Sequence, residues 1–172
     1  TKRNPIEKIR ADQKLKGLKT KEYIHYGDSH FKKELWKPIK TKLFRNKPTG
    51  GLWASAIDAE WGWRDWSMVN DFNTENLKES FCFTLSKSAN VFHIYSKTDL
   101  KNIPMQTLLP KSMAFPDFEE LMKQGYDAVE LHLSEDKATN EFDSLYWSLY
   151  GWDCDSILIF NPDIIIEKEN NN

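Results

Sequence analysis

The chain has 172 residues, 13% of them aromatic, and a formal net charge of -2 at pH 7. This length and aromatic content fit one folded domain with a hydrophobic core, and they exclude a disordered tail. No apolar run approaches the roughly 20 residues of a membrane span, and no signal-peptide pattern is visible. The two cysteines, Cys82 and Cys154, lie beside apolar residues. We therefore expect reduced, buried thiols in a cytoplasmic protein with no membrane partner, with a disulfide between the two cysteines as the alternative.

The charge is distributed unevenly along the chain. Residues 1–47 carry 15 Lys or Arg and 5 Asp or Glu, whereas residues 48–172 carry 9 and 21. A basic first quarter is typical of proteins that contact a polyanion such as a nucleic acid. Lysine-rich helices are also common as solvated surfaces, so the charge favours a polyanion partner without requiring one.

The hydrophobic pattern predicts short strands separated by long connections. In chain order we expect a basic helix at 1–20, a strand at 22–26, a helix at 31–44, a strand at 52–57, a helix or irregular cap at 61–72, strands at 81–85 and 91–95, a helix at 115–124, a strand at 126–133, a polar loop at 134–144, a central strand at 156–160 and a frayed tail at 167–172. This order is not the strand–helix alternation of a doubly wound fold, and no GxGxxG or Walker motif is present. The sequence therefore predicts a single α+β domain over residues 1–172, with its core at 22–166.

The first candidate for chemistry is the strand end His25-Tyr26-Gly27. An imidazole on a strand can donate to or accept from a ribose hydroxyl, and a nearby glycine lets a flat ligand approach the backbone. A planar carboxamide needs one donor and one acceptor, which the N–H and C=O of one residue can supply. The alternative is a half-exposed histidine before a turn, which is the more common role of a lone His-x-Gly.

The second candidate is the run Gly50-Gly51-Leu52-Trp53-Ala54-Ser55. Paired glycines permit unusual backbone angles and close approach. Trp53 then offers a flat face for stacking on a heterocycle, and Ser55 points to the same side of a strand. The alternative, and the more common use of this pattern, is a Gly-Gly turn followed by a core tryptophan.

The third candidate is the pair of acids Asp153 and Asp155, which precede the last apolar strand. A carboxylate there could polarise a hydroxyl or stabilise positive charge that develops on a sugar. If strand alternation includes both residues, they share a face and could titrate as a coupled pair. The alternative is a turn acid that caps the strand.

The remaining candidates have weaker patterns. Trp61, Trp63 and Trp66 could stack on bases, although tryptophans so close together more often form a packed lid or core. His93 and His132 lie in expected strands and are interpreted as structural, with His132 the better placed to line a site. The histidines and acids show no metal-ligand spacing, so we expect no metal site. Neither cysteine has the basic setting of a nucleophile.

Together these residues resemble the ADP-ribosyltransferase superfamily, and within it the branch of poly(ADP-ribose) polymerases and diphtheria-toxin-like enzymes. That branch carries a strand with His, a strand with Gly-x-Tyr and a late strand headed by Glu. His25 matches the first, Trp53 stands in place of the tyrosine, and Asp155 or Asp153 stands near the glutamate position. The register of the closing strand could instead place Ser156 in the acid's slot.

The resemblance implies a split β-sandwich of short mixed or antiparallel strands with peripheral helices, and NAD bound in its cleft. In that plan His25 holds a ribose hydroxyl, main-chain groups of Gly27 hold the nicotinamide amide, and Trp53 stacks on the ring. The acid stabilises the cationic ribose as nicotinamide leaves. The implied cofactor-binding residues are His25, Tyr26, Gly27, Gly51, Leu52, Trp53 and Ser55, and the implied catalytic residues are His25, Trp53, Asp155 and Asp153.

The implied activity is NAD-dependent ADP-ribosyl transfer, as in bacterial toxins or phage-defence effectors, with a neutralising antitoxin as a further expected partner. The acceptor is a nucleic acid or a protein, and the basic residues 1–47 favour nucleic acid slightly. One alternative is a non-catalytic nucleic-acid-binding module that uses the basic N-terminal region and the tryptophans at 61–66. Another is an enzyme of the same superfamily that removes a 2′-phosphate from RNA, which would need more Arg and His near the cleft.

Overall fold

The computed structural model describes residues 20–110 and 113–169. The basic helix expected at 1–20 lies outside these residues, apart from its last position. Within them, no helix is long and apolar enough to cross a membrane.

Seven short strands form one mixed sheet in the order β4-β5-β6-β2-β1-β3-β7. Neighbouring strands are antiparallel, except for β4 and β5, which are parallel. With few and short helices, this arrangement confirms the α+β class. The strands are β1 (Glu22–Tyr26), β2 (Leu52–Ala56), β3 (Ser80–Leu85), β4 (Val91–Ile94), β5 (Ala128–Leu131), β6 (Ser156–Ile159) and β7 (Ile165–Glu167).

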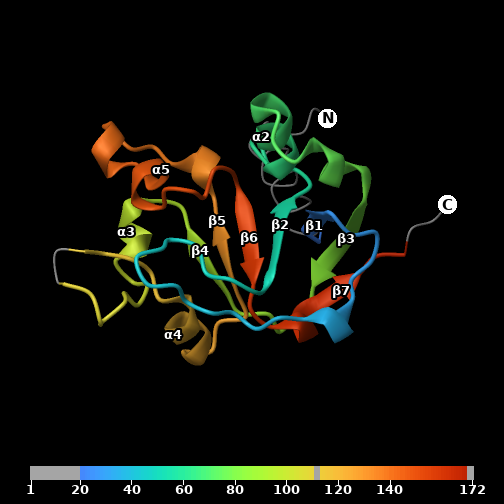
Figure 1. The fold of residues 1–172 in the computed structure, drawn as a ribbon, viewed down its shortest axis with the longest axis horizontal. Helices are drawn as coiled ribbons and strands as arrows, with labels where there is room; N and C mark the ends of the chain where they lie inside the picture. The colour runs from blue at the N-terminus through green and yellow to red at the C-terminus, as the bar shows by residue number, and fades with distance from the viewer. Residues whose placement is uncertain (1–19, 111–112, 170–172) are drawn as a thin grey trace, which may run out of the picture.

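The helices lie around the rim of the sheet (Figure 1). The α-helices are α2 (Trp63–Asn70), α3 (Lys97–Leu100), α4 (Phe118–Lys123) and α5 (Leu145–Ser148), and the 3-10 helices are η1 (Lys33–Leu35), η2 (Thr74–Lys78), η3 (Leu133–Glu135), η4 (Glu141–Asp143) and η5 (Pro162–Ile164). Two of the 3-10 turns, η3 and η4, fall in the segment expected to be a polar loop. The periphery is therefore mostly irregular backbone rather than long helices.

Both faces of β5 and β6 are buried, so these strands form the centre of the fold. Val129 and Leu158 belong to one apolar cluster, whereas Ala128 and Ile157 belong to a second cluster on the other face. Because side chains alternate along a strand, an apolar run without polar alternation must be covered on both sides. This confirms the central position that we predicted for the strand at 156–160.

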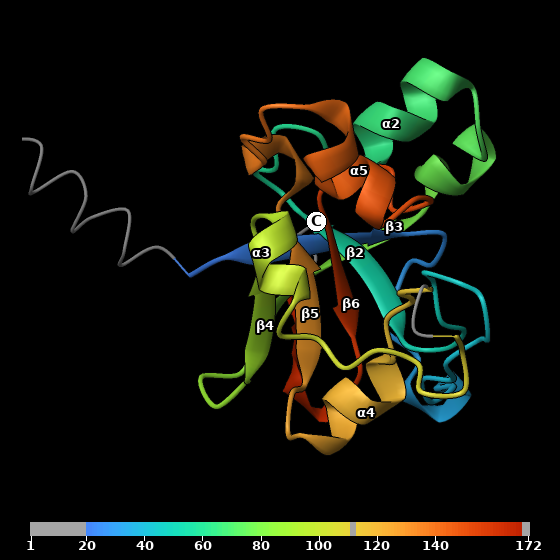
Figure 2. The same cartoon turned by 90° about the vertical axis from the view of Figure 1, so that its left-hand side faces the viewer.

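The sheet opens where β1 leaves β2. Only two residue pairs join these strands, Tyr23 with Ala56 and Ile24 with Ser55, whereas β1 pairs with β3 along its whole length. In Figure 2, β1 runs across the direction of β4, β5 and β6. The rest of β1 and the start of β2 therefore separate, and this separation positions the site described below.

The helix predicted at 31–44 is wrong. The structure has only the 3-10 turn η1 there, followed by extended chain. Pro38 interrupts the segment because it cannot donate a main-chain hydrogen bond. Trp36 packs against one cluster and Ile39 lies inside the other, whereas Leu35, Leu43 and Phe44 are exposed. The helical spacing of these apolar residues therefore did not produce one buried face.

The C-terminal part of the sheet reaches into the segment expected to be a tail. Glu167 ends β7 and pairs with Phe83, and the Lys168 N–H donates to the Cys82 carbonyl at 2.9 Å. Both cysteines are free, Cys154 being buried and Cys82 half-buried.

Candidate functional site

A cavity of about 270 Å³ lies where β1 and β2 separate, and we call it the β1–β2 cavity. Seven of the residues that the sequence singled out line it: His25, Tyr26, Trp53, Ser55, Trp63, Asp153 and Ser156. They come from three distant segments of the chain. The volume is close to the lower end of the range for small-molecule sites, roughly 300–1,000 Å³.

The His25 side chain connects β1 to β2 beyond the end of their main-chain pairing. Its Nδ1 lies 2.6 Å from the main-chain oxygen of Trp53. A carbonyl can only accept, so Nδ1 carries the proton, and in the neutral ring Nε2 remains as an acceptor. The ring packs on Phe81 at 5.2 Å, and Nε2 is 3.8 Å from an Asp28 carboxylate oxygen. The fold thus fixes both the position and the tautomer of His25.

Main-chain direction along β1 decides which residue presents its backbone to the cavity. The Glu22 carbonyl accepts from the Ile57 N–H on the β2 side, whereas the Gly27 N–H donates to the Glu79 carbonyl, next to β3. Main-chain groups alternate in direction along a strand, so the N–H and C=O of Tyr26 face the β2 side, beyond the end of the ladder. Tyr26 lines the cavity and Gly27 does not, so the donor–acceptor pair expected at Gly27 is available at Tyr26 instead.

Trp53 is a wall of the β1–β2 cavity and also part of the apolar packing. Its ring meets Trp152 edge to face at 4.7 Å, and the Lys47 ammonium lies 5.3 Å above the ring. The ring therefore already presents its negative face to a cation. The contact with Trp152 supports the core interpretation of this tryptophan, and its place in the cavity wall is compatible with the binding interpretation.

The paired glycines allow the chain to pass close to its own backbone. Gly50 and Gly51 have φ values of 80° and 68°. A Cβ on Gly50 would lie 2.1 Å from the Pro38 oxygen, and one on Gly51 would lie 2.6 Å from the Ile159 oxygen. These contacts explain the glycines without a ligand, so the turn interpretation holds for this pair.

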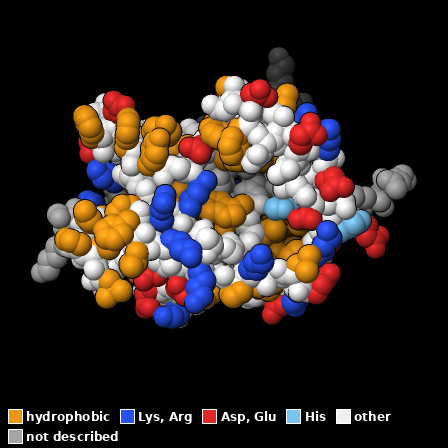
Figure 3. Space-filling view, viewed as in Figure 1, with side chains coloured by type: hydrophobic (Ala, Val, Ile, Leu, Met, Phe, Trp, Pro, Cys, Tyr) orange, Lys and Arg blue, Asp and Glu red, His pale blue; other side chains and the backbone are white. Residues whose placement is uncertain are grey.

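A second groove, of about 440 Å³, adjoins the β1–β2 cavity and shares His25, Pro48 and Trp53 with it. Gly51 and Leu52 line this groove rather than the cavity. The predicted cofactor residues are therefore divided between two adjoining hollows, with His25 and Trp53 between them. Figure 3 shows this hollowed face, with Lys and Arg side chains in a band beside it.

The two acids before β6 have different surroundings. Asp155 is 8% exposed, and its carboxylate accepts from the Ser134 N–H at 2.8 Å, the Ser134 hydroxyl at 2.6 Å and the Trp61 N–H at 3.3 Å. It joins two loops and does not line the β1–β2 cavity, whereas the half-buried Asp153 does. They do not form the pair on one face that we considered, because β6 begins only at Ser156.

The cavity wall also contains Cys154, which was not predicted as a binding residue, and Ser156, which was considered only as the alternative in the acid's slot. The Cys154 sulfur lies 3.3 Å from the Ser156 hydroxyl oxygen, and burial raises the pKa of the Cys154 thiol. A protonated, buried thiol is not a nucleophile at neutral pH. Their position follows from the apolar strand that they precede, but no local motif marks them.

The tryptophans at 61–66 form a packed cap over this end of the sheet. Trp63 and Trp66 stack at 5.2 Å, and the Trp61 Nε1–H donates to the Asp153 carbonyl at 3.2 Å. The Ser55 hydroxyl accepts from the Trp63 N–H and donates to the Asp155 carbonyl. Ser55 therefore reaches the cavity, as predicted, but its hydroxyl already ties β2 to the cap.

Comparisons of the chain with protein-family models, curated proteins and solved structures give no match. The functional argument therefore depends on the geometry of the site.

Proposed function

We propose that the protein is an NAD-dependent ADP-ribosyltransferase whose β1–β2 cavity binds the nicotinamide half of NAD. The observation that supports this most strongly is the meeting of His25, Trp53 and Asp153, from three distant segments, around one cavity. The sheet that opens between β1 and β2 is compatible with the split β-sandwich of that superfamily.

Each residue then has a defined task. His25 accepts a hydrogen bond from a ribose hydroxyl at Nε2, because Nδ1 is committed to the Trp53 carbonyl. The N–H and C=O of Tyr26 hold the carboxamide. The nicotinamide ring of NAD is cationic, so it gains from the Trp53 face in the same way as the Lys47 ammonium.

Asp153 is the acid of this proposal. A carboxylate in the cavity stabilises the positive charge that develops on the ribose as the bond to nicotinamide breaks. Asp155 is unsuited to this task because three donors already occupy its carboxylate. The adjoining groove takes the rest of the dinucleotide, and its walls include Lys32 and Lys37, which suit a diphosphate.

We propose a nucleic-acid acceptor because a basic band borders both hollows (Figure 3). Its members are exposed and have no ion-pair partner among the described residues: Lys37, Lys40, Lys42, Arg45 and Lys47. The Asn46 side chain contacts the Tyr150 carbonyl at 3.3 Å, and near it Tyr146, Trp147 and Tyr150 are 45%, 45% and 61% exposed. Exposed aromatic rings beside a cationic band suit the stacking of single-stranded bases.

The test is incubation of the protein with labelled NAD and cell lysate, followed by separate nuclease and protease digestion. Label that nuclease releases and protease does not is the expected result. A His93→Ala variant is the matched control, since His93 is an exposed histidine that lines neither the β1–β2 cavity nor the adjoining groove. Absence of both nicotinamide release and transfer in the wild type would contradict the proposal.

A second candidate is a non-catalytic nucleic-acid-binding module. The basic band and the exposed aromatic residues of α5 favour it, in place of the packed tryptophans at 61–66. Salt-sensitive binding of nucleic acid without consumption of NAD would support it. The toxin or phage-defence role, the neutralising partner and the cytoplasmic location stay predictions.

A further inference from the structure

A second cluster of polar side chains lies on the other side of the molecule, away from the β1–β2 cavity. The parallel pairing of β4 and β5 places His93 opposite Glu130, and His132 follows at the end of β5. Glu130 is 3% exposed and His132 is 9% exposed, whereas the His93 side chain is 41% exposed. The sequence pattern did not predict this cluster, because the parallel pairing that brings it together is not visible locally.

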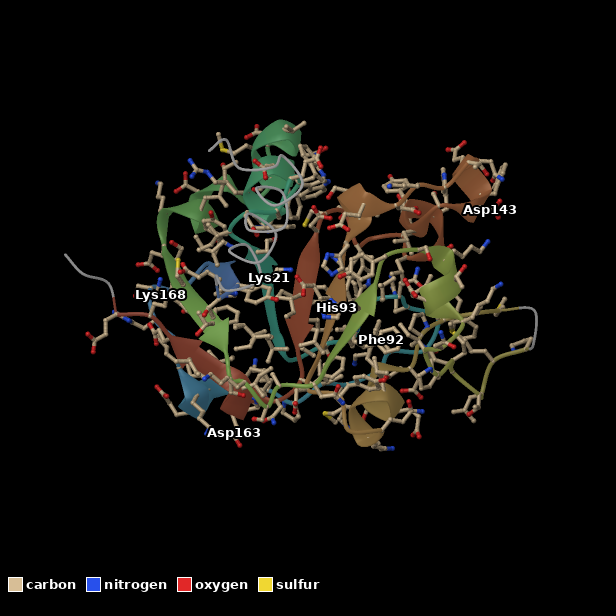
Figure 4. All side chains as sticks on the ribbon, turned by 180° about the vertical axis from the view of Figure 1, so that it is seen from behind. Lys21, Phe92, His93, Asp143, Asp163 and Lys168 are labelled. Atoms are coloured by element: carbon tan, nitrogen blue, oxygen red, sulfur yellow. The ribbon has the colours of Figure 1, made fainter. Side chains whose placement is uncertain are left out.

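Glu130 is a buried carboxylate, which is costly without partners. Lys21 binds its Oε1 at 2.5 Å, and the Tyr23 hydroxyl donates to its Oε2 at 3.0 Å. Burial and the charge of Glu130 raise the pKa of Tyr23, which keeps that hydroxyl protonated as a donor. Oε2 also faces both imidazoles, so it can accept a further partner on that side. Lys21 and His93 are labelled on this side of the sheet in Figure 4.

Three possible ligand atoms surround one point. His93 Nδ1 is 3.0 Å from His132 Nε2 and 3.5 Å from Glu130 Oε2, and His132 Nε2 is 3.9 Å from Glu130 Oε2. Tetrahedral Zn²⁺ with ligands at about 2.0–2.2 Å places its ligand atoms about 3.3–3.5 Å apart. Of the two separations that involve His93, one lies below this range and the other at its upper end, so a small rotation of this exposed side chain adjusts both. The His132–Glu130 separation is longer, so one of these two side chains must also shift slightly toward the ion.

The surroundings favour a cation. A hollow of about 750 Å³ beside Glu130 and His132 has six carboxylate residues and one lysine in its wall. A metal binds the neutral form of imidazole, and His132 offers its Nε2 atom to the site. The other ring nitrogen, Nδ1, is 3.7 Å from Glu135, a common second partner for a metal-bound histidine.

We propose that His93, Glu130 and His132 form a site for a divalent zinc-type ion, with its fourth position open. Two histidines and one glutamate with an open position is a ligand set of zinc sites. In the absence of an ion, the His93 Nδ1–H donates to His132 Nε2. When the ion binds, His93 carries its proton on the exposed Nε2, and both inward lone pairs bind the metal. This site is independent of NAD binding.

The experiment uses the full chain after chelation and dialysis. Calorimetric titration with Zn²⁺ should show one tight site in the wild type. Titration with Co²⁺ should give the intense visible absorption of a tetrahedral site. His93→Ala should weaken Zn²⁺ binding more than 10²-fold. Loss of a residue that only hydrogen-bonds a metal ligand typically weakens binding 10–100-fold, so the larger loss identifies His93 as a ligand. His30→Ala, the matched surface control, should bind as the wild type does.

Lys21→Met separates a metal site from a structural ion pair. Its ammonium competes with a metal for Glu130, so its removal should strengthen Zn²⁺ binding several-fold. Equal Zn²⁺ affinity in the wild type and His93→Ala would overturn the proposal, as would weaker binding in Lys21→Met. Because His93 is exposed on the edge strand β4, its variant should fold, and circular dichroism checks this.

Discussion

Replacement of the two acids before β6 by asparagine should have opposite consequences. Asp155→Asn removes one of two acceptor oxygens that receive three hydrogen bonds, from the Ser134 N–H, the Ser134 hydroxyl and the Trp61 N–H. At least one donor then loses its acceptor in a site that is 8% exposed. Hydrogen bonds to charged groups contribute about 1.5–3 kcal/mol each. We therefore expect the free energy of unfolding to fall by about 2–4 kcal/mol.

For a chain of this length, a loss of 1 kcal/mol lowers Tm by about 2–4 °C, so Asp155→Asn should melt about 4–16 °C below the wild type. Asp153→Asn should change the free energy of unfolding by about 0.5 kcal/mol or less, as at other sites without a partner. Its NAD turnover should fall roughly 10²-fold, because the charge that stabilises the cationic ribose is lost.

The assay is a thermal melt of both variants beside measurement of nicotinamide release, at a temperature where both are folded. A normal melt for Asp155→Asn together with lost turnover would refute the reasoning, since it would make Asp155 the catalytic acid. Normal turnover in Asp153→Asn would exclude Asp153 from that role.

The remaining predictions concern the cavity and the basic band. Trp53→Phe and Trp53→Tyr should retain most NAD binding in a calorimetric titration, whereas Trp53→Ala should lose roughly 1–3 kcal/mol of stacking; equal losses would indicate a core role only. Charge reversal of Lys40 and Lys42 to Glu should weaken labelling of nucleic acid while NAD hydrolysis without acceptor persists; loss of both would contradict a role in acceptor binding. Burial raises the pKa of the Cys154 thiol, so alkylation of Cys154 at pH 8 should be slower than that of a free cysteine. The rate of alkylation should continue to increase as the pH rises above about 8.5, the usual pKa of a cysteine. NAD should slow it further, and unchanged alkylation would place NAD outside the cavity.

Six of the seven strands could be predicted from the sequence because their burial is a local pattern, whereas β7 was missed. The apolar run at 156–160 indicated a strand covered on both faces, and β6 is such a strand. The helix predicted at 31–44 was wrong because some of its apolar residues pack against two separate clusters and the others are exposed. Helical spacing does not distinguish one buried face from two separate contacts, and Pro38 was the better signal.

The candidate site could be predicted only in part. His25 and Trp53 were found because their types and order matched a known plan, and the structure places both at one cavity. The choice between Asp153 and Asp155 required the start of β6, which local pattern fixes only to within a residue or two. The metal cluster around Glu130 required the parallel pairing of β4 and β5, which no local pattern discloses.

Calorimetric titration of NAD into the wild type, His25→Asn and His93→Asn tests the central claim most directly, since His93 is exposed and lines neither hollow. The asparagine amide can replace Nδ1 as donor to the Trp53 carbonyl, but it lacks the acceptor at Nε2. Loss of one hydrogen bond of about 1–1.5 kcal/mol corresponds to roughly tenfold in affinity. We predict one NAD per chain for the wild type and His93→Asn, and about tenfold weaker binding for His25→Asn. No binding by the wild type, or equal binding by all three proteins, would contradict the account.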